Sequence, residues 1–316
     1  MGFRKLYQEL VKKIMKLAIT PSNEDLVLVL FDTDSKKVLK IKSDKRGYNK
    51  NADDTRPVHR PFGITWNKDN IFIANRKNLL VYDSNLNFSD NIENILDENT
   101  HQITFYKNNI ISTMTRKDCI KFVNLKNYSS AFFHPEKGWL DRAKTLDHFE
   151  EKFHINSVVA KDGFVYIMLH NRGENYSEIL VLNLQTKDIE KRIQTTATCA
   201  HGIYLDGDTL GTLNTREENL ILGSNIIRCS AWKDKFLRGM AGEKQIAVAN
   251  FLPQQRRYRG HGGSYISIVE NNNVKKHCYV DNIGAVNDMR RIDGKDFCHH
   301  NEYKFPYTGD FVNDIN

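Results

Sequence analysis

Residues 153–172 read FHINSVVAKDGFVYIMLHNR. An apolar run is followed by a tight Lys-Asp-Gly turn, a second apolar run and a polar cluster that ends in Arg172. This order is typical of two antiparallel strands joined by a short turn. The same plan recurs along most of the chain, so this stretch predicts the repeating unit of the fold.

Six segments open copies of this unit, and the last two are fainter than the others. The openings are Phe62, His101, His154, His201, Arg238 and Asn287, which gives steps of 39, 53, 47, 37 and 49 residues. Repeats of this length suit propeller blades of four short strands. No helical pattern separates the strands, which argues against a parallel α/β sheet.

We therefore expect an all-β fold, a six-bladed β-propeller spanning residues 21–301. Too little chain follows Asn287 to complete a sixth blade. The apolar runs 25–31 and 37–41 are expected to supply its missing strands and so to close the ring. Residues 302–316 are expected to form a loosely attached polar tail.

Residues 2–17 show apolar side chains at helical spacing with basic side chains between them. This pattern predicts an amphipathic helix within residues 1–20. Such a helix could lie on an anionic membrane, but packing across its own domain is the favoured reading.

Composition limits the function. The net charge of +7 arises from 46 basic and 39 acidic residues spread along the chain, so nucleic-acid binding, which needs a clustered basic surface, is not expected. Five cysteines without metal-type spacing, and no secretory signal, lead us to expect a cytoplasmic protein with reduced thiols.

Antiparallel geometry places the candidate site. The start of each innermost strand and the end of the second strand lie on one face of a blade. The repeat openings, with Asp288 beside Asn287, should therefore ring the mouth of the central channel. A wider ring should hold the residues that close the second strands: Arg76, Arg116, His170, Arg172, Arg216, His299 and His300.

Three histidines occupy equivalent places in consecutive repeats. His101, His154 and His201, with His59 as a possible fourth ligand, could bind a divalent Zn, Fe, Mn or Cu ion. Alternatively, each imidazole caps its strand and hydrogen-bonds a neighbouring blade. Without a metal, His154 or His201 could act as a general acid or base.

The arginines also have two interpretations. They could satisfy turn carbonyls at blade interfaces, or clamp a carboxylate, phosphate or sulfate group. Arg238 is the best functional candidate because it stands in the inner ring. We take His154, His201 and Arg238 as catalytic candidates, and the wider ring with Asp288 as ligand-binding candidates.

Several stretches resemble an uncharacterised propeller family catalogued as a domain of unknown function. They are His101-Gln102-Ile103, His154-Ile155-Asn156-Ser157, Ala200-His201-Gly202-Ile203, Phe236-Leu237-Arg238-Gly239-Met240 and Ser264-Tyr265-Ile266-Ser267-Ile268. The resemblance implies a propeller and no particular reaction. More distantly, the layout is similar to gluconolactonase-type propellers, whose acidic and Asn metal ligands this histidine-rich mouth does not reproduce.

Two functions remain open at this point. The first is an enzyme of the lyase, isomerase or hydrolase type, with a His-lined pocket, with or without a metal ion, for a small anionic or sugar-like substrate. The second is a non-catalytic propeller that binds a protein or glycan on its top face. Fold alone does not distinguish them.

Overall fold

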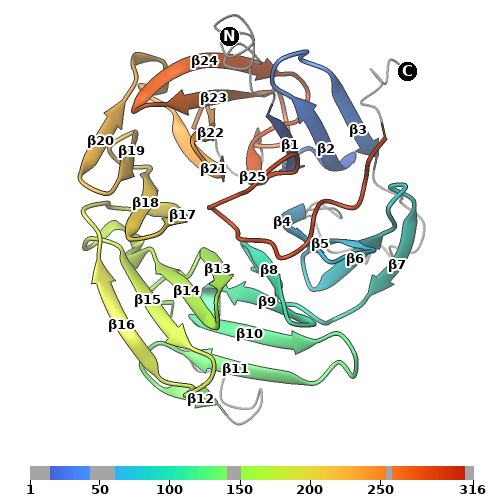
Figure 1. The fold of residues 1–316 in the computed structure, drawn as a ribbon, viewed down its shortest axis with the longest axis vertical. Helices are drawn as coiled ribbons and strands as arrows, with labels where there is room; N and C mark the ends of the chain where they lie inside the picture. Colours follow the sequence, from blue (N-terminus) through green and yellow to red (C-terminus); the bar gives the residue numbers. More distant parts are fainter. Residues whose placement is uncertain (1–14, 43–60, 141–150, 254–257, 310–316) are drawn as a thin grey trace, which may run out of the picture.

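A computed structural model describes residues 15–42, 61–140, 151–253 and 258–309. Six antiparallel sheets stand around a central axis in the order of the chain, as Figure 1 shows. The protein is a six-bladed β-propeller, as the repeat predicted.

The strands of the first three blades follow one another along the chain, innermost first. Blade one consists of β4 (Pro61–Trp66), β5 (Ile71–Asn75), β6 (Asn78–Tyr82) and β7 (Phe88–Ile92). Blade two consists of β8 (Ile103–Tyr106), β9 (Asn109–Met114), β10 (Cys119–Asn124), β11 (Ser130–His134) and β12 (Gly138–Leu140). Blade three consists of β13 (Ser157–Lys161), β14 (Phe164–Leu169), β15 (Glu178–Asn183) and β16 (Ile189–Gln194).

The remaining blades include the one in which the two ends of the propeller meet. Blade four consists of β17 (Ala200–Asp206), β18 (Thr209–Asn214), β19 (Asn219–Leu222) and β20 (Asn225–Arg228). Blade five consists of β21 (Phe236–Gly242), β22 (Gln245–Phe251), β23 (Ser264–Glu270) and β24 (Asn273–Val280). Blade six consists of β25 (Val286–Arg291), β1 (Lys16–Pro21), β2 (Leu26–Asp32) and β3 (Val38–Lys42).

The sixth blade closes the ring with N-terminal strands, as predicted. Its innermost strand, β25, pairs with β1, so that Ile19 faces Met289 and Thr20 faces Asp288. β1 in turn pairs with β2. Three N-terminal strands complete the blade, where the sequence indicated two.

The predicted N-terminal helix is wrong where the structure describes it. Lys16–Pro21 form strand β1, while residues 1–14 lie outside the described part of the chain. In the described ranges the helical segments are short 3-10 turns: η1 (Thr115–Lys117), η3 (Asn171–Gly173) and η4 (Ser230–Trp232), with no α-helix.

Leu17, Ala18 and Ile19 are all fully buried, because a strand inside a blade is covered on both faces. A short apolar run of this kind fits a buried strand or a helix equally well, and pairing with β25 and β2 decides for the strand.

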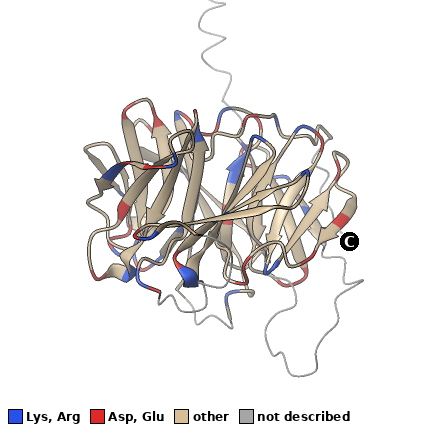
Figure 2. Cartoon of the chain, turned by 90° about the horizontal axis from the view of Figure 1, so that it is seen from below, with Lys and Arg blue, Asp and Glu red and all other residues tan. Residues whose placement is uncertain are grey.

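No helix in the described ranges is long and apolar enough to cross a bilayer. Figure 2, a side view of the disc, shows Lys and Arg positions interspersed with Asp and Glu positions along the ribbon. All five cysteines are free thiols.

Apolar side chains fill the space between neighbouring blades. One cluster joins blades five and six and includes Ile19, Ala247 and Met289. Comparable clusters lie at the other five interfaces of the ring. The core is therefore divided into thin layers, and the blades hold their inner strands at fixed places around the axis.

The segment after β25 crosses the ends of the inner strands, and in Figure 1 it runs over the centre of the ring. Leu205 N donates to Phe297 O over 2.9 Å, and Trp66 Nε1 donates to Tyr303 O over 2.8 Å. The Phe305 ring meets Trp66 edge-on at 5.0 Å between centroids. The described part of the expected loose tail, up to residue 309, is thus packed against the propeller. It covers the channel at the end opposite to the repeat openings.

Candidate functional site

Glycine bulges shape the starts of three inner strands. The pairing register shifts between Pro61 and Ile64, between His201 and Tyr204, and between Leu237 and Met240, and each interval contains a glycine: Gly63, Gly202 or Gly239. Gly202 and Gly239 have φ of +72° and +86°, which L residues rarely adopt. A bulge of this type bends a strand and re-aims the neighbouring side chain. The residue before each glycine consequently reaches the same end of the channel.

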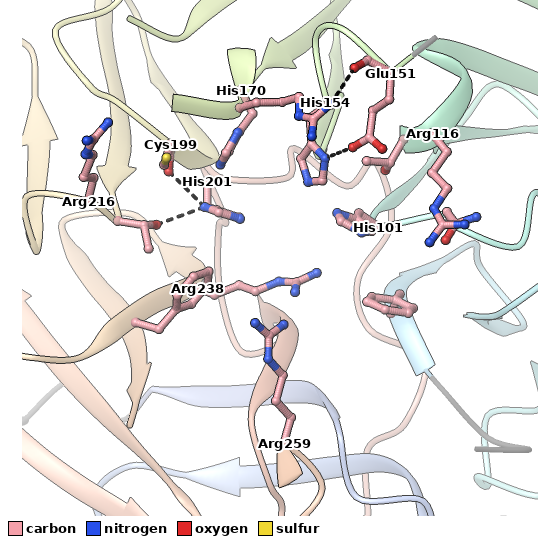
Figure 3. Close-up of a pocket in the computed structure, with 16 residues that line it drawn as sticks. His101, Arg116, Glu151, His154, His170, Cys199, His201, Arg216, Arg238 and Arg259 are labelled. Carbon is pink, nitrogen blue, oxygen red and sulfur yellow. Dashed lines mark hydrogen bonds and ion pairs between the residues drawn. The ribbon is translucent and has the colours of Figure 1, made fainter. Parts of the chain in front are cut away.

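A pocket of about 590 Å³ opens at this end of the channel. Figure 3 shows histidine and arginine side chains from several blades converging on it. The described residues that line it are Phe62, Asn99, His101, Thr115, Arg116, Glu151, His154, His170, Cys199, Arg172, His201, Thr215, Arg216, Phe236, Arg238 and Arg259. The structure therefore brings together most of the residues that the repeat placed on this face.

Four histidine rings form a continuous wall of the pocket. Centroid distances are 5.3 Å from His101 to His154, 4.9 Å from His154 to His170 and 5.1 Å from His170 to His201. Phe62 stacks on His101 at 5.3 Å and continues the wall. The rings pack against each other, so the wall is aromatic as well as polar.

His201 is held by hydrogen bonds on one side of its ring. Its Nδ1 lies 2.9 Å from Thr215 Oγ1 and 3.1 Å from Cys199 O. Burial, followed by the neighbouring His170 and Arg238, holds the pKa of His201 well below its ordinary value. The imidazole is therefore neutral at neutral pH.

His170 is also neutral. Burial, and then the neighbouring His154 and Arg238, lower its pKa to about 3. Its buried Nδ1 makes no hydrogen bond to any described residue. Arg238 adds to the effect of burial and disfavours protonation of both His170 and His201.

The carboxylate of Glu151 contacts Nδ1 of His154, three residues later in the chain. Asp118 positions this segment, because its carboxylate accepts a hydrogen bond from Phe153 N over 2.6 Å. His154 itself has a φ of +51°, which turns the chain as it enters the third blade. A carboxylate thus orients one imidazole of the wall.

The arginines reach the pocket from different elements. Arg172 donates to Glu151 O over 3.1 Å, and Arg216 donates to Gly173 O over 2.9 Å. Both of these contacts are to backbone carbonyls, which do not neutralise the charge. The guanidinium groups of Arg238 and Arg259 lie over aromatic rings, 5.5 Å from the centroid of Phe62 and 5.6 Å from that of Phe236 respectively.

Four of the predicted site residues lie elsewhere. Arg76 does not line the pocket and pairs with Glu98 at 2.6 Å. Asp288 is buried in the channel and pairs with Arg290 at 3.0 Å. His299 and His300 belong to the segment that covers the opposite end.

Both of these histidines serve the fold. His299 Nε2 lies 2.9 Å from Met289 O, and His300 Nε2 lies 2.8 Å from Leu205 O. Their predicted place on the pocket face is wrong, because the chain leaves β25 at the far end and stays there. His59 falls outside the described residues.

Among the described residues, the predicted ligands His101, His154 and His201 are not arranged as a metal-ligand set. Within the described ranges no three His, Cys, Asp or Glu side chains are arranged to hold a metal ion. His101, His154 and His201 line one pocket, but they are separated by ring packing and by the intervening His170.

The sequence interpretation missed several pocket residues: Glu151, Cys199, Thr215, Phe236 and Arg259. Glu151 lies at the end of the long connection before the third blade. Arg259 lies in the connection between β22 and β23. The only signals were that the connection before His154 is a long polar interruption next to a blade opening, and that the connection holding Arg259 is basic and glycine-rich.

Comparisons with known proteins show the fold and no family. No protein-family model matches the chain, and no curated protein matches it in sequence. The resemblance to a domain of unknown function and to gluconolactonase-type propellers therefore has no support from a family match.

Solved structures do resemble this chain. A chain of the nidogen/laminin complex is 7% identical, with a TM-score of 0.59 over 88% of this chain and 98% of the other. A protein of unknown function from Bacteroides caccae is 10% identical, with a TM-score of 0.54 over 89% and 100%. The Cps50 (Swd1) β-propeller domain of Myceliophteria thermophila is 9% identical, with a TM-score of 0.49 over 82% and 85%. At these identities the similarity concerns the fold alone.

Proposed function

We propose that the pocket at the repeat openings binds a small organic anion. The observation that carries this proposal is the convergence of five arginines on a single pocket whose one described carboxylate, Glu151, is already paired with His154. Guanidinium groups are the natural partners of carboxylate, phosphate and sulfate groups.

The volume of the pocket supports a small ligand. A cavity of about 590 Å³ falls within the usual range for small-molecule sites. Phe62 and Phe236 provide apolar surface beside the arginines, which suits the carbon skeleton of an organic anion. After burial, Arg238 contributes to the lowered pKa values of His170 and His201, and this charge supports a preference for anions.

Isothermal titration with phosphate, citrate and gluconate at low salt tests this function. Arg116→Met and Arg238→Met should each weaken binding by about tenfold or more, because a charge-assisted hydrogen bond contributes about 1.5–3 kcal/mol. Arg76→Met is the matched control. Arg76 closes the second strand of blade one as Arg116 does in blade two, yet it lies outside the pocket.

Two results would contradict anion binding. One is no binding of any probe at millimolar concentration. The other is a loss of affinity in Arg76→Met as large as in the two pocket variants.

One further observation favours an enzyme over a simple binding protein. The Glu151 carboxylate pairs with Nδ1 of His154. A carboxylate that orients an imidazole in this way is the usual support of a general base or acid. We therefore take His154 as the residue that would transfer a proton in an elimination, isomerisation or hydrolysis.

A substrate screen distinguishes the two functions. Wild-type protein is incubated with hydroxy acids, uronates and phosphate monoesters, and products are followed by NMR. Turnover that falls in Glu151→Gln, with binding of the same compound retained, supports the enzyme. Binding without turnover across the panel supports a binding protein.

A further inference from the structure

The hydrogen-bond network fixes which nitrogen of His201 carries the proton. Cys199 O is a carbonyl oxygen and can only accept, and it lies 3.1 Å from Nδ1. Thr215 donates its own hydroxyl proton to Leu237 O over 2.8 Å, so its oxygen is left to accept from Nδ1 at 2.9 Å. Both contacts require a proton on Nδ1.

The other ring nitrogen is therefore a hydrogen-bond acceptor. In Figure 3, Nε2 of His201 points toward the middle of the pocket, away from Cys199. It forms no hydrogen bond with any described residue. Because the pKa of His201 lies well below its ordinary value, this nitrogen keeps its lone pair at neutral pH.

The anionic group of a ligand does not satisfy this acceptor. The ionised oxygens of carboxylate, phosphate and sulfate groups accept hydrogen bonds, so they suit the arginines and not Nε2 of His201. The ligand needs a separate donor. An ammonium group would meet the repulsion of Arg238, whereas a hydroxyl group donates without adding charge.

We infer that Nε2 of His201 accepts a hydrogen bond from a hydroxyl group of the ligand, which makes the ligand class hydroxylated organic anions such as sugar acids or sugar phosphates. This inference rests on the proposed anion-binding function. It assigns the charge of the ligand to the arginines and its hydroxyl group to His201.

Matched ligand pairs test the assignment. Glycerol 3-phosphate is compared with propyl phosphate, and gluconate with hexanoate, by isothermal titration. The hydroxylated member of each pair should bind about tenfold tighter or more, since its analogue cannot donate a hydrogen bond to Nε2 of His201. In His201→Phe, which keeps a ring but removes the acceptor, this preference should shrink to about threefold or less.

A control variant separates pocket effects from general effects. His300→Phe replaces a histidine on the opposite face, where Nε2 lies 2.8 Å from Leu205 O. It should keep the full hydroxyl preference. One pair consists of phosphates and the other of carboxylates. The difference in affinity between the two pairs therefore shows which anionic group the arginines prefer.

The outcomes distinguish the two proposals. Equal affinity for both members of each pair, with Arg238→Met still weakening them, overturns the hydroxyl assignment and leaves anion binding intact. No affinity for any member overturns anion binding itself.

NMR on the wild-type protein needs no variant. The side-chain nitrogens of His201 should report the Nδ1-protonated neutral tautomer at pH 7. An Nε2-protonated ring would overturn the inference.

Discussion

Asp288 and Arg290 form an ion pair of 3.0 Å in which both side chains are about 1–2% exposed. Arg290 also donates to Ile64 O and Ile103 O, both over 2.7 Å, and Asp288 accepts from Gln102 Nε2 over 3.1 Å. The pair thereby ties β25 to the inner strands of blades one and two. Asp288, which the repeat suggested as a ligand-binding residue, has a place in the core of the channel.

Asp288→Asn should destabilise the protein by about 3–5 kcal/mol, because it leaves the Arg290 charge buried without a partner. Urea unfolding measures this change. Glu98→Gln, which breaks the partly exposed pair with Arg76, is the control and should cost less than about 1 kcal/mol. Similar effects of the two variants would contradict a special role for the buried pair.

Acidification should destabilise the protein through His170. Its folded-state pKa of about 3 lies below the unfolded value of 6.5, so the unfolded chain takes up the proton first. The stability that its neutral form contributes is lost as the pH falls below about 6.5. Between pH 7 and pH 5 the wild type should lose roughly 2 kcal/mol more than His170→Phe. Parallel pH profiles in urea titrations would show that His170 is not the group responsible.

The bulge at Gly239 should be more sensitive to substitution than a turn of the same conformation. A Cβ on Gly239 would lie 2.9 Å from Val286 Cγ1, whereas Gly163, at φ +87°, has nothing within 4 Å. Gly163→Ala should cost about 1–2 kcal/mol for its backbone conformation. Gly239→Ala should cost about 1–3 kcal/mol more because of overpacking, and it should weaken anion binding by displacing Arg238. Urea unfolding and titration with phosphate measure both effects.

Closure of the ring should depend on strand β1. Ile19 is fully buried between Val29 and Met289, so Ile19→Ala should lower the free energy of unfolding by about 2–5 kcal/mol. Phe88→Ala, on the outer strand β7 where Phe88 is 41% exposed, should cost less than about 1 kcal/mol. Equal losses in urea unfolding would mean that β1 contributes no more than an outer strand.

Much of the site follows from local signals in the chain. The repeat openings mark the innermost strands, and antiparallel pairing puts their first residues on one face. This reasoning predicted that His101, His154, His201 and Arg238 share one face with Arg116 and Arg216. All six line the pocket in the structure. It also located the closure of the ring in the N-terminal strands.

Other features depend on contacts between distant parts of the chain. Leu17-Ala18-Ile19 is too short an apolar run to tell a strand from a helix, and only pairing with β25 makes it β1. His299 and His300 look equivalent to the rim residues by sequence position. They lie at the opposite end because the segment after β25 packs across the channel against Trp66 and Leu205.

By itself, the sequence determined the number of blades and the identity of the inner-strand openings, because both arise from local turns and strand alternation. The tertiary structure decided which polar groups meet. Glu151 and Arg259 approach the pocket from long connections without a regular period, and the proton on His201 is placed by Thr215 and Cys199 O. Such contacts depend on how packed blades bring separate segments together, which no local pattern encodes.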